Sequence, residues 1–290
     1  MSPTRFFGSL MVLTAIIAAG LSSCRQAKQD NKKTVVVSIE PLRYFTEQIA
    51  GKRFKVVSVV PEGYSPETYE PTPEQLLAVS EAAAYLKVGQ LGFETTWLEK
   101  ISLNDPELRV FDTSDSLRQT TSVVRQAKFD PHTWTSPSNA EVISRNICKA
   151  LCSIDSAGAK VYRQNLGRLL VHIHKVDMSI RNTLRNLPNR TFVTAHPSLT
   201  YFADDYGLRQ LSIEKDGKEP TPAQLAEFIV RCRQEGVKVI LVQPEFSRES
   251  ATVLAREIGA RVAGINPLSY HWDTEMINTA KALRGSTNTQ

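Results

Sequence analysis

Two histidines of the chain each stand beside a proline, where an imidazole could bind a metal ion or act as a base. His132 lies in the segment FDPHTWTSP (129–137), and His196 follows a short apolar run and precedes Pro197. Proline fixes its own φ and biases the residue before it toward an extended backbone, so both side chains stand on constrained segments. Taken alone, the His132 pattern leaves three interpretations open: a ligand, a catalytic base or a packed ring.

Other polar side chains follow the remaining apolar runs. Glu67 follows the run at 54–60, Glu245 follows the run at 237–243, and Asn266 follows the run at 260–265. In open parallel α/β sheets, ligands gather beyond the carboxyl ends of the strands. We therefore expect these side chains to face one cleft with the two histidines. Two imidazoles and a carboxylate form a donor set that zinc, manganese and iron all accept.

The elements that must position these residues alternate between strand and helix patterns, in two similar halves. The motif Thr-Pro-x-Gln-Leu occurs at 72–76 and again at 221–225, and Tyr-Phe precedes a glycine-ended helix pattern at 44–45 and at 201–202. The same two features in the same order indicate two copies of one βα unit. Repeated βαβ units imply parallel sheets covered by helices, so we predict an α/β fold with two (βα) lobes.

A long helix is predicted between the halves. Residues 155–188 contain no proline before position 188, and their apolar residues recur at intervals of three and four. This pattern indicates one rigid helix of roughly 30 residues and on the order of 45 Å. We expect an N-terminal lobe at 34–154, the linking helix at 155–188 and a C-terminal lobe at 189–290, with a metal cleft between lobes that rotate only modestly.

The N-terminus resembles that of an exported bacterial lipoprotein. One basic residue, Arg5, precedes an apolar run that is too short to span a membrane and is typical of a signal peptide, here 1–23. Leu-Ser-Ser-Cys at 21–24 resembles a lipobox, which makes Cys24 the expected lipidation site. Residues 24–33 are polar and predict a tether. The mature protein is therefore expected in the periplasm or on the cell surface, anchored to a bacterial membrane.

Charge and cysteine content exclude several classes of function. The net charge is +5, and positive and negative residues are mixed along the chain, which argues against a nucleic-acid partner. Cys148, Cys152 and Cys232 are too few for a disulfide framework and wrongly spaced for a structural zinc site, so we expect buried thiols. The motifs H-E-x-x-H and G-x-S-x-G are absent, which disfavours a zinc-dependent hydrolase and a serine hydrolase.

From about residue 34 to 285 the chain resembles the metal-binding lipoproteins of ABC importers, which capture zinc or manganese. The resemblance is carried by SPETYEPTP, FDPHTW, TAHPSLTYFADDYGL, GKEPTPAQLAEF, GVKVILVQPEFS and GARVAGINPLS. It implies two lobes joined by a long helix, one metal ion in the cleft, and delivery of that ion to an ABC permease. It implies no catalysis, and we expect a monomer.

The resemblance also implies a ligand set, from which this chain departs at two positions. His132 and His196 match the family's histidines, whereas Glu67 stands where a histidine is usual and Asn266 where an aspartate is usual. The family's set of three histidines and one aspartate supplies one negative charge, and so does this chain's set of Glu67, His132, His196 and Asn266. The carboxylate could therefore have moved from one side of the cleft to the other. Because an amide is a weaker ligand, a water or another side chain could replace Asn266; the candidates are Glu245, His271 and Asp273.

Zinc is the expected metal, with manganese or iron as the alternatives. Binding should tighten above the pKa of the histidines, because only a neutral imidazole binds a metal. Two other functions remain open from the sequence. Glu67 or Glu245 beside bound zinc could activate water in a hydrolase, and a lipoprotein adhesin is also compatible with the lipid anchor.

Overall fold

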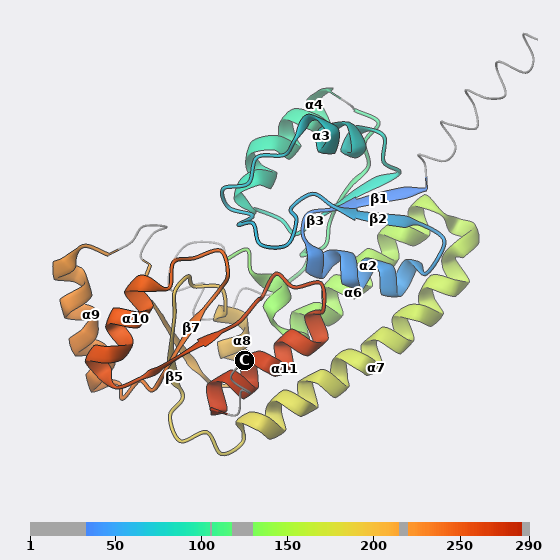
Figure 1. Cartoon of the computed structure of the whole chain (residues 1–290). Helices are drawn as coiled ribbons and strands as arrows, with labels where there is room; N and C mark the ends of the chain where they lie inside the picture. Colours follow the sequence, from blue (N-terminus) through green and yellow to red (C-terminus); the bar gives the residue numbers. More distant parts are fainter. Residues whose placement is uncertain (1–32, 105, 118–129, 215–219, 286–290) are drawn as a thin grey trace, which may run out of the picture.

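The computed structural model describes residues 33–104, 106–117, 130–214 and 220–285. Within these residues the chain forms two four-stranded sheets, one in each lobe (Figure 1). The first sheet has the order β2-β1-β3-β4, and its strands are Thr34–Val37 (β1), Lys55–Ser58 (β2), Ala84–Lys87 (β3) and Val110–Asp112 (β4). The second has the order β6-β5-β7-β8, with Thr191–Thr194 (β5), Arg209–Ser212 (β6), Val239–Val242 (β7) and Arg261–Gly264 (β8).

Helices cover both sheets. Those of the first half are Glu40–Ala50 (α2), Pro73–Ser80 (α3), the π-helical turn Glu94–Leu98 (η1), Glu99–Asn104 (α4), the 3₁₀ turn Thr133–Thr135 (η2) and Pro137–Ile154 (α6). Those of the second half are Thr200–Asp205 (α8), Pro222–Gln234 (α9), Glu249–Ile258 (α10) and Trp272–Arg284 (α11). The 3₁₀ turn Ser156–Gly158 (η3) and the helix Ala159–Leu184 (α7) connect the two halves.

The predicted repeat is confirmed by the topology. All strand pairs are parallel, and each strand of the first sheet has a counterpart in the same place of the second. The two Thr-Pro-x-Gln-Leu motifs begin α3 and α9 with the same capping box, in which Thr72 pairs with Gln75 and Thr221 pairs with Gln224. The local sequence therefore determines where these helices begin in both lobes.

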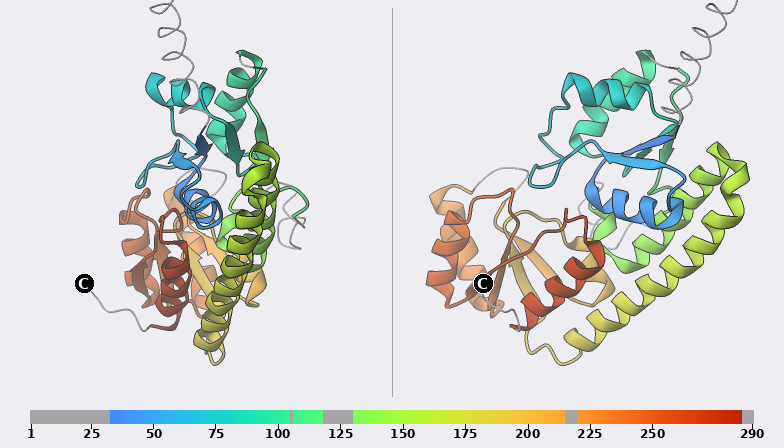
Figure 2. Two further views of the ribbon diagram at one scale, coloured as in Figure 1. Left: turned by 90° about the vertical axis from the view of Figure 1, so that its right-hand side faces the viewer. Right: turned by 45° about the vertical axis from the view of Figure 1, so that its right-hand side comes forward.

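The linking helix α7 is shorter than the predicted span of 155–188. The Asp155 side chain accepts a hydrogen bond from the backbone N–H of Gly158 and forms an ion pair with Arg53 at 2.7 Å, so the chain turns at η3 before the helix begins. The helix packs against α2, α6 and α11 and runs along one side of the molecule past both lobes (Figure 2). Its single continuous course agrees with the predicted rigid connection.

The larger of two hydrophobic clusters spans both lobes, and the smaller lies in the C-terminal lobe. The larger buried cluster contains Phe45 and Trp134 of the first half together with Phe192 and Trp272 of the second. The Trp272 ring lies 4.9 Å from that of Phe45, and its indole N–H donates to the backbone oxygen of Trp134 at 2.7 Å. The helix α11 thus belongs to the C-terminal half of the sequence but packs beneath the first lobe. A shared core of this kind favours small rotations between the lobes.

The expected signal peptide, the tether and Cys24 lie outside the described residues. Among the helices of the described ranges, we find none with the length and apolarity needed to cross a membrane. The thiols of Cys148, Cys152 and Cys232 are free; Cys148 and Cys232 are buried, as expected, whereas Cys152 is only half-buried.

Candidate metal centre

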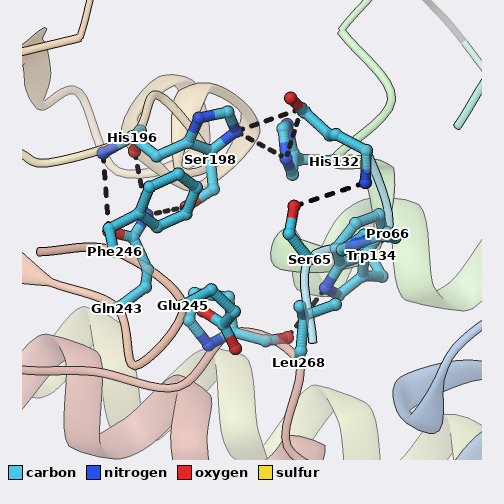
Figure 3. Close-up of a pocket in the computed structure, with 12 residues that line it drawn as sticks. Ser65, Pro66, His132, Trp134, His196, Ser198, Gln243, Glu245, Phe246 and Leu268 are labelled. Atoms are coloured by element: carbon cyan, nitrogen blue, oxygen red, sulfur yellow. Dashed lines mark hydrogen bonds and ion pairs between the residues drawn. The ribbon is translucent and has the colours of Figure 1, made fainter. Parts of the chain in front are cut away.

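Three predicted side chains converge at the carboxyl ends of the strands. Glu67 lies in the loop between β2 and α3, His132 lies just before η2, and His196 follows β5. Their candidate ligand atoms all lie within 4.8 Å of one another, and both histidines are buried. Figure 3 shows the two imidazoles facing each other from opposite walls of the pocket. Side chains from both lobes thus meet at one site, as the sequence predicts.

The spacing of the donor atoms suits a single small cation. The Nε2 atoms of His132 and His196 are 3.3 Å apart, and Oε1 of Glu67 is 3.2 Å from His196 Nε2. Two nitrogens bound tetrahedrally to zinc at about 2.0–2.1 Å would be separated by about 3.3–3.4 Å. The distance from Glu67 Oε1 to His132 Nε2 is 3.9 Å, so this carboxylate would move closer by about 0.5 Å on binding.

His132 is oriented by a carboxylate two residues earlier. Oδ1 of Asp130 accepts from the His132 backbone N–H at 2.9 Å and lies 2.8 Å from its Nδ1. The backbone oxygen of Asp130 accepts from the Tyr201 hydroxyl of the other lobe at 2.9 Å. A hydrogen on Nδ1 therefore points at Asp130 and leaves the Nε2 lone pair facing the pocket, which is the tautomer that a metal ligand needs.

His196 has the same arrangement with different partners. Its Nδ1 lies 2.6 Å from Oε2 of Glu214, and its ring stacks on Phe246 at 4.7 Å with an interplanar angle of 6°. The side chain of Gln243 donates to the His196 backbone oxygen at 2.9 Å. Ring, tautomer and backbone are thus all held, and Nε2 again faces the pocket.

The electrostatics of the site favour a positive charge between the two imidazoles. Two Nε2 lone pairs at 3.3 Å repel each other unless a proton or a cation lies between them. Burial acts to lower the pKa of His196, but the hydrogen bonds and charges of Glu67 and Glu214 outweigh it and raise this pKa. The hydrogen bond with His196 in turn lowers the pKa of Glu67 despite partial burial. A divalent cation would replace that proton.

The backbone of Glu67 rests directly on a glycine of the loop before η1. A Cβ atom at Gly92 would lie 2.4 Å from the carbonyl oxygen of Glu67, closer than any ordinary contact. The next residue, Phe93, donates its backbone N–H to the oxygen of Pro66 at 3.2 Å. The close approach at Gly92 therefore fixes the position of the Glu67 backbone relative to the two histidines.

The pocket around the donors is small. Its cavity of about 20 Å³ has room for an atom the size of a water molecule. Its wall is formed by residues of both lobes: Ser65, Pro66, Glu67, His132, Trp134, His196, Ser198, Gln243, Glu245, Phe246, Pro267 and Leu268. The Trp134 indole donates to the Pro267 oxygen at 2.8 Å and joins the walls. Such a volume suits a single ion.

Glu245 also lines this pocket, and one of its two carboxylate oxygens is unpartnered within the described residues. Its Oε1 is buried and has no hydrogen-bond partner among the described residues. Burial raises the pKa of the Glu245 carboxyl, and its own backbone N–H and the charge of His196 offset this only in part. Figure 3 shows Glu245 on the wall that also carries Gln243 and Phe246.

The other predicted donors lie elsewhere. The side chain of Asn266 donates to Glu62 Oε1 at 2.9 Å, its Oδ1 accepts from the backbone N–H of Leu268 at 3.2 Å, and it is not part of the pocket wall. Asp273 lies 2.8 Å from Nε2 of His172 on α7. His271 is exposed at the start of α11, outside the pocket wall. Asn266 and Asp273 thus use their side chains for hydrogen bonds to Glu62 and to His172 outside the pocket.

Sequence reasoning missed the residues that position the ligands. Asp130 stands in the Asp-Pro-His segment, and its spacing of two residues from His132 was a usable signal. Glu214 follows β6 at the same end of the sheet as the ligands, so topology could have indicated it. Nothing in the local sequence around Gly92 indicates its contact with Glu67.

Comparison with known proteins agrees with the fold and the site. The family model described as zinc-uptake complex component A, periplasmic, matches residues 35–283. The crystal structure of ZnuA superposes with a TM-score of 0.82 at 34% identity, covering 87% of this chain and 98% of that one.

Two curated relatives are similar over most of their length. A putative metal-binding protein of Treponema pallidum is 28% identical over 86% of this chain and 83% of its own length. The manganese-binding lipoprotein MntA of Halalkalibacterium halodurans is 26% identical over 89% of this chain and 87% of its own length. Together with the family match, which spans nearly all of the described residues, these similarities establish that the chain belongs to the family of periplasmic zinc-uptake components.

Proposed function

We propose that this protein captures one divalent transition metal ion, zinc in the first place, between its lobes. The observation that carries the proposal is the 3.3 Å separation of the two Nε2 atoms, which come from opposite lobes and have their Nδ1 atoms bound to carboxylates. Glu67 adds an oxygen donor and a negative charge. His132, His196 and Glu67 are the proposed ligands.

Zinc is favoured over manganese because two imidazoles and a tetrahedral spacing are typical of zinc sites. The family description names zinc uptake, while one relative is named for manganese. Carboxylate oxygens suit manganese better than imidazoles do. The balance between the two metals therefore depends on how many oxygen donors the site contains.

We further propose that the loaded protein delivers its ion to the membrane subunits of an ABC importer. Capture followed by release requires no chemical step, and the cavity beside the donors has the size of a single ion or water molecule. A lipid on Cys24 would hold the protein near that importer and raise its effective concentration there. Family membership in an uptake complex supports this role.

The test is metal binding by chelator-stripped mature protein, measured by native mass spectrometry and by competition with a chromophoric chelator. We expect one zinc ion per chain, and loss of at least about 100-fold in affinity for His132→Ala and His196→Ala, because each removes a direct donor. His174→Ala is the matched control, since this histidine is exposed on α7.

Uptake in cells provides the second arm. Zinc-dependent growth should depend on this gene and fail with the His132→Ala form. Stripped wild-type protein that takes up no transition metal, or a His132→Ala/His196→Ala protein that binds zinc as the wild type does, would refute the proposal.

A further inference from the structure

We infer that Glu245 supplies a fourth donor to the metal ion, in the place where sequence resemblance would put Asn266. This inference rests on the proposed metal-binding function and specifies the site further. The completed site would contain two imidazole nitrogens, from His132 and His196, and two carboxylates, from Glu67 and Glu245.

The first support is the environment of the Glu245 carboxylate. A buried carboxylate oxygen without a partner is costly, because it has lost its hydration and gained no hydrogen bond. Oε1 of Glu245 is in this state within the described part of the chain. The carboxylates of Asp130 and Glu214, by contrast, are each bound to an imidazole. Glu245 lies outside the 4.8 Å cluster of the other three donors, so its side chain would have to turn toward a cation in the pocket, which would then satisfy this oxygen.

The second support is position. Glu67 and Glu245 are the two acidic side chains of the pocket wall. Glu245 precedes Phe246, whose ring stacks on His196, so the backbone next to Glu245 is held against one of the proposed ligands. Both residues lie in the segment after β7, at the carboxyl end of a strand beside β5.

The third support is that the competing donors are occupied. Both ends of the Asn266 amide are hydrogen-bonded, to Glu62 and to the backbone of Leu268. Asp273 is paired with His172 on the linking helix. Recruiting either residue would break existing bonds, whereas recruiting Glu245 breaks no bond at Oε1 among the described residues.

Charge gives the functional consequence. Two carboxylates and two neutral imidazoles carry a charge of minus two, which cancels that of a divalent ion. Without Glu245 the direct donors would carry a single negative charge, and the remaining compensation would come only from Asp130 and Glu214, one step away behind the imidazoles. A second carboxylate also raises the affinity for manganese relative to zinc, because manganese depends more on charged oxygen donors. Glu245 would thus tune selectivity as well as affinity.

The experiment compares wild type, Glu245→Gln, Glu67→Gln and the charge-matched control Glu249→Gln, an exposed residue of α10. Zinc and manganese affinities are measured by chelator competition, and the visible absorption of bound Co²⁺ reports the coordination number and donor set. For Glu245→Gln we expect zinc affinity to fall at least about tenfold, manganese affinity to fall further, and the Co²⁺ spectrum to change. Glu249→Gln should match the wild type in all three.

The melting temperature of the metal-free protein separates ligation from a structural role. Replacing an unpartnered buried carboxylate with a neutral amide should leave this temperature unchanged or raise it. If Glu245→Gln keeps the wild-type affinity and Co²⁺ spectrum while Glu67→Gln weakens binding, the inference fails and the proposed function stands. An affinity loss with an unchanged Co²⁺ spectrum also overturns direct ligation. Wild-type protein that binds none of the three metals overturns both proposals.

Discussion

Replacing Gly92 with alanine should weaken metal binding although residue 92 carries no donor. The added Cβ would lie 2.4 Å from the carbonyl oxygen of Glu67, and also 3.1 Å from its Cα. The contact is with backbone, so no side-chain rotation can relieve it. The Glu67 loop must therefore move away from the loop before η1.

The required displacement follows from the contact distance. Ordinary contacts of a Cβ begin near 3.4 Å, so the carbonyl oxygen must shift by about 1 Å. Oε1 of Glu67 lies 3.2 Å from His196 Nε2, and a shift of this size is about twice the roughly 0.5 Å by which the carboxylate must adjust to share an ion with both imidazoles. We expect affinity for zinc to fall by about 10–100-fold, as when a ligand loses its support. Overpacking should also cost about 1–3 kcal/mol of folding free energy.

The assay is chelator competition on stripped protein, combined with thermal unfolding. Gly167→Ala is the control: this glycine lies within α7 with open space around it, so alanine should stabilise the helix by up to about 1 kcal/mol without affecting the metal. A double-mutant cycle with Glu67→Ala completes the test, because Gly92→Ala should cost little affinity once Glu67 is gone. The reasoning is refuted if Gly92→Ala binds zinc like the wild type, or loses the same affinity in the Glu67→Ala background.

Two further predictions concern the histidines. Because Glu67 and Glu214 raise the pKa of His196 above its ordinary 6.5 against the effect of burial, zinc affinity should rise with pH until that raised pKa is passed. Protonated His196 stabilises the protein without metal fully below about pH 6.5, and this contribution is lost as pH rises through the folded-state pKa. The stability of the protein without metal and its zinc affinity should therefore change in opposite directions in that range. Zinc titrations and thermal unfolding between about pH 5.5 and 8.5 check this, and an affinity that does not vary over that range contradicts it. Asp130→Asn and Glu214→Gln should each lower zinc affinity about 10–100-fold, because the imidazole loses the carboxylate that fixes its Nδ1–H tautomer and its orientation. Chelator competition measures this. Wild-type affinity in both variants would show that the carboxylates do not orient the ligands.

The strands, the helix starts and two of the proposed ligands could be predicted from local sequence. Thr72 and Thr221 cap their helices through partners three residues away, and such short-range chemistry needs no tertiary contact. His196 directly follows a strand of a parallel sheet, and parallel topology brings such positions to one edge, while His132 was marked by its Asp-Pro-His segment. Alternation of strand and helix, and the repeat of one βα unit, were sufficient to predict two lobes with a site between them.

The tertiary structure decided what the individual side chains contact. Asn266 and Glu245 both follow strands, and the sequence favoured Asn266 with Glu245 as a substitute, yet Asn266 bonds to Glu62, 204 residues away, and Glu245 lines the pocket with an oxygen that has no hydrogen-bond partner among the described residues. The start of α7 was likewise set by the ion pair of Asp155 with Arg53, 102 residues earlier. Such pairings depend on differences of about an ångström in how distant segments pack, and no local pattern of residue types encodes a distance of that kind.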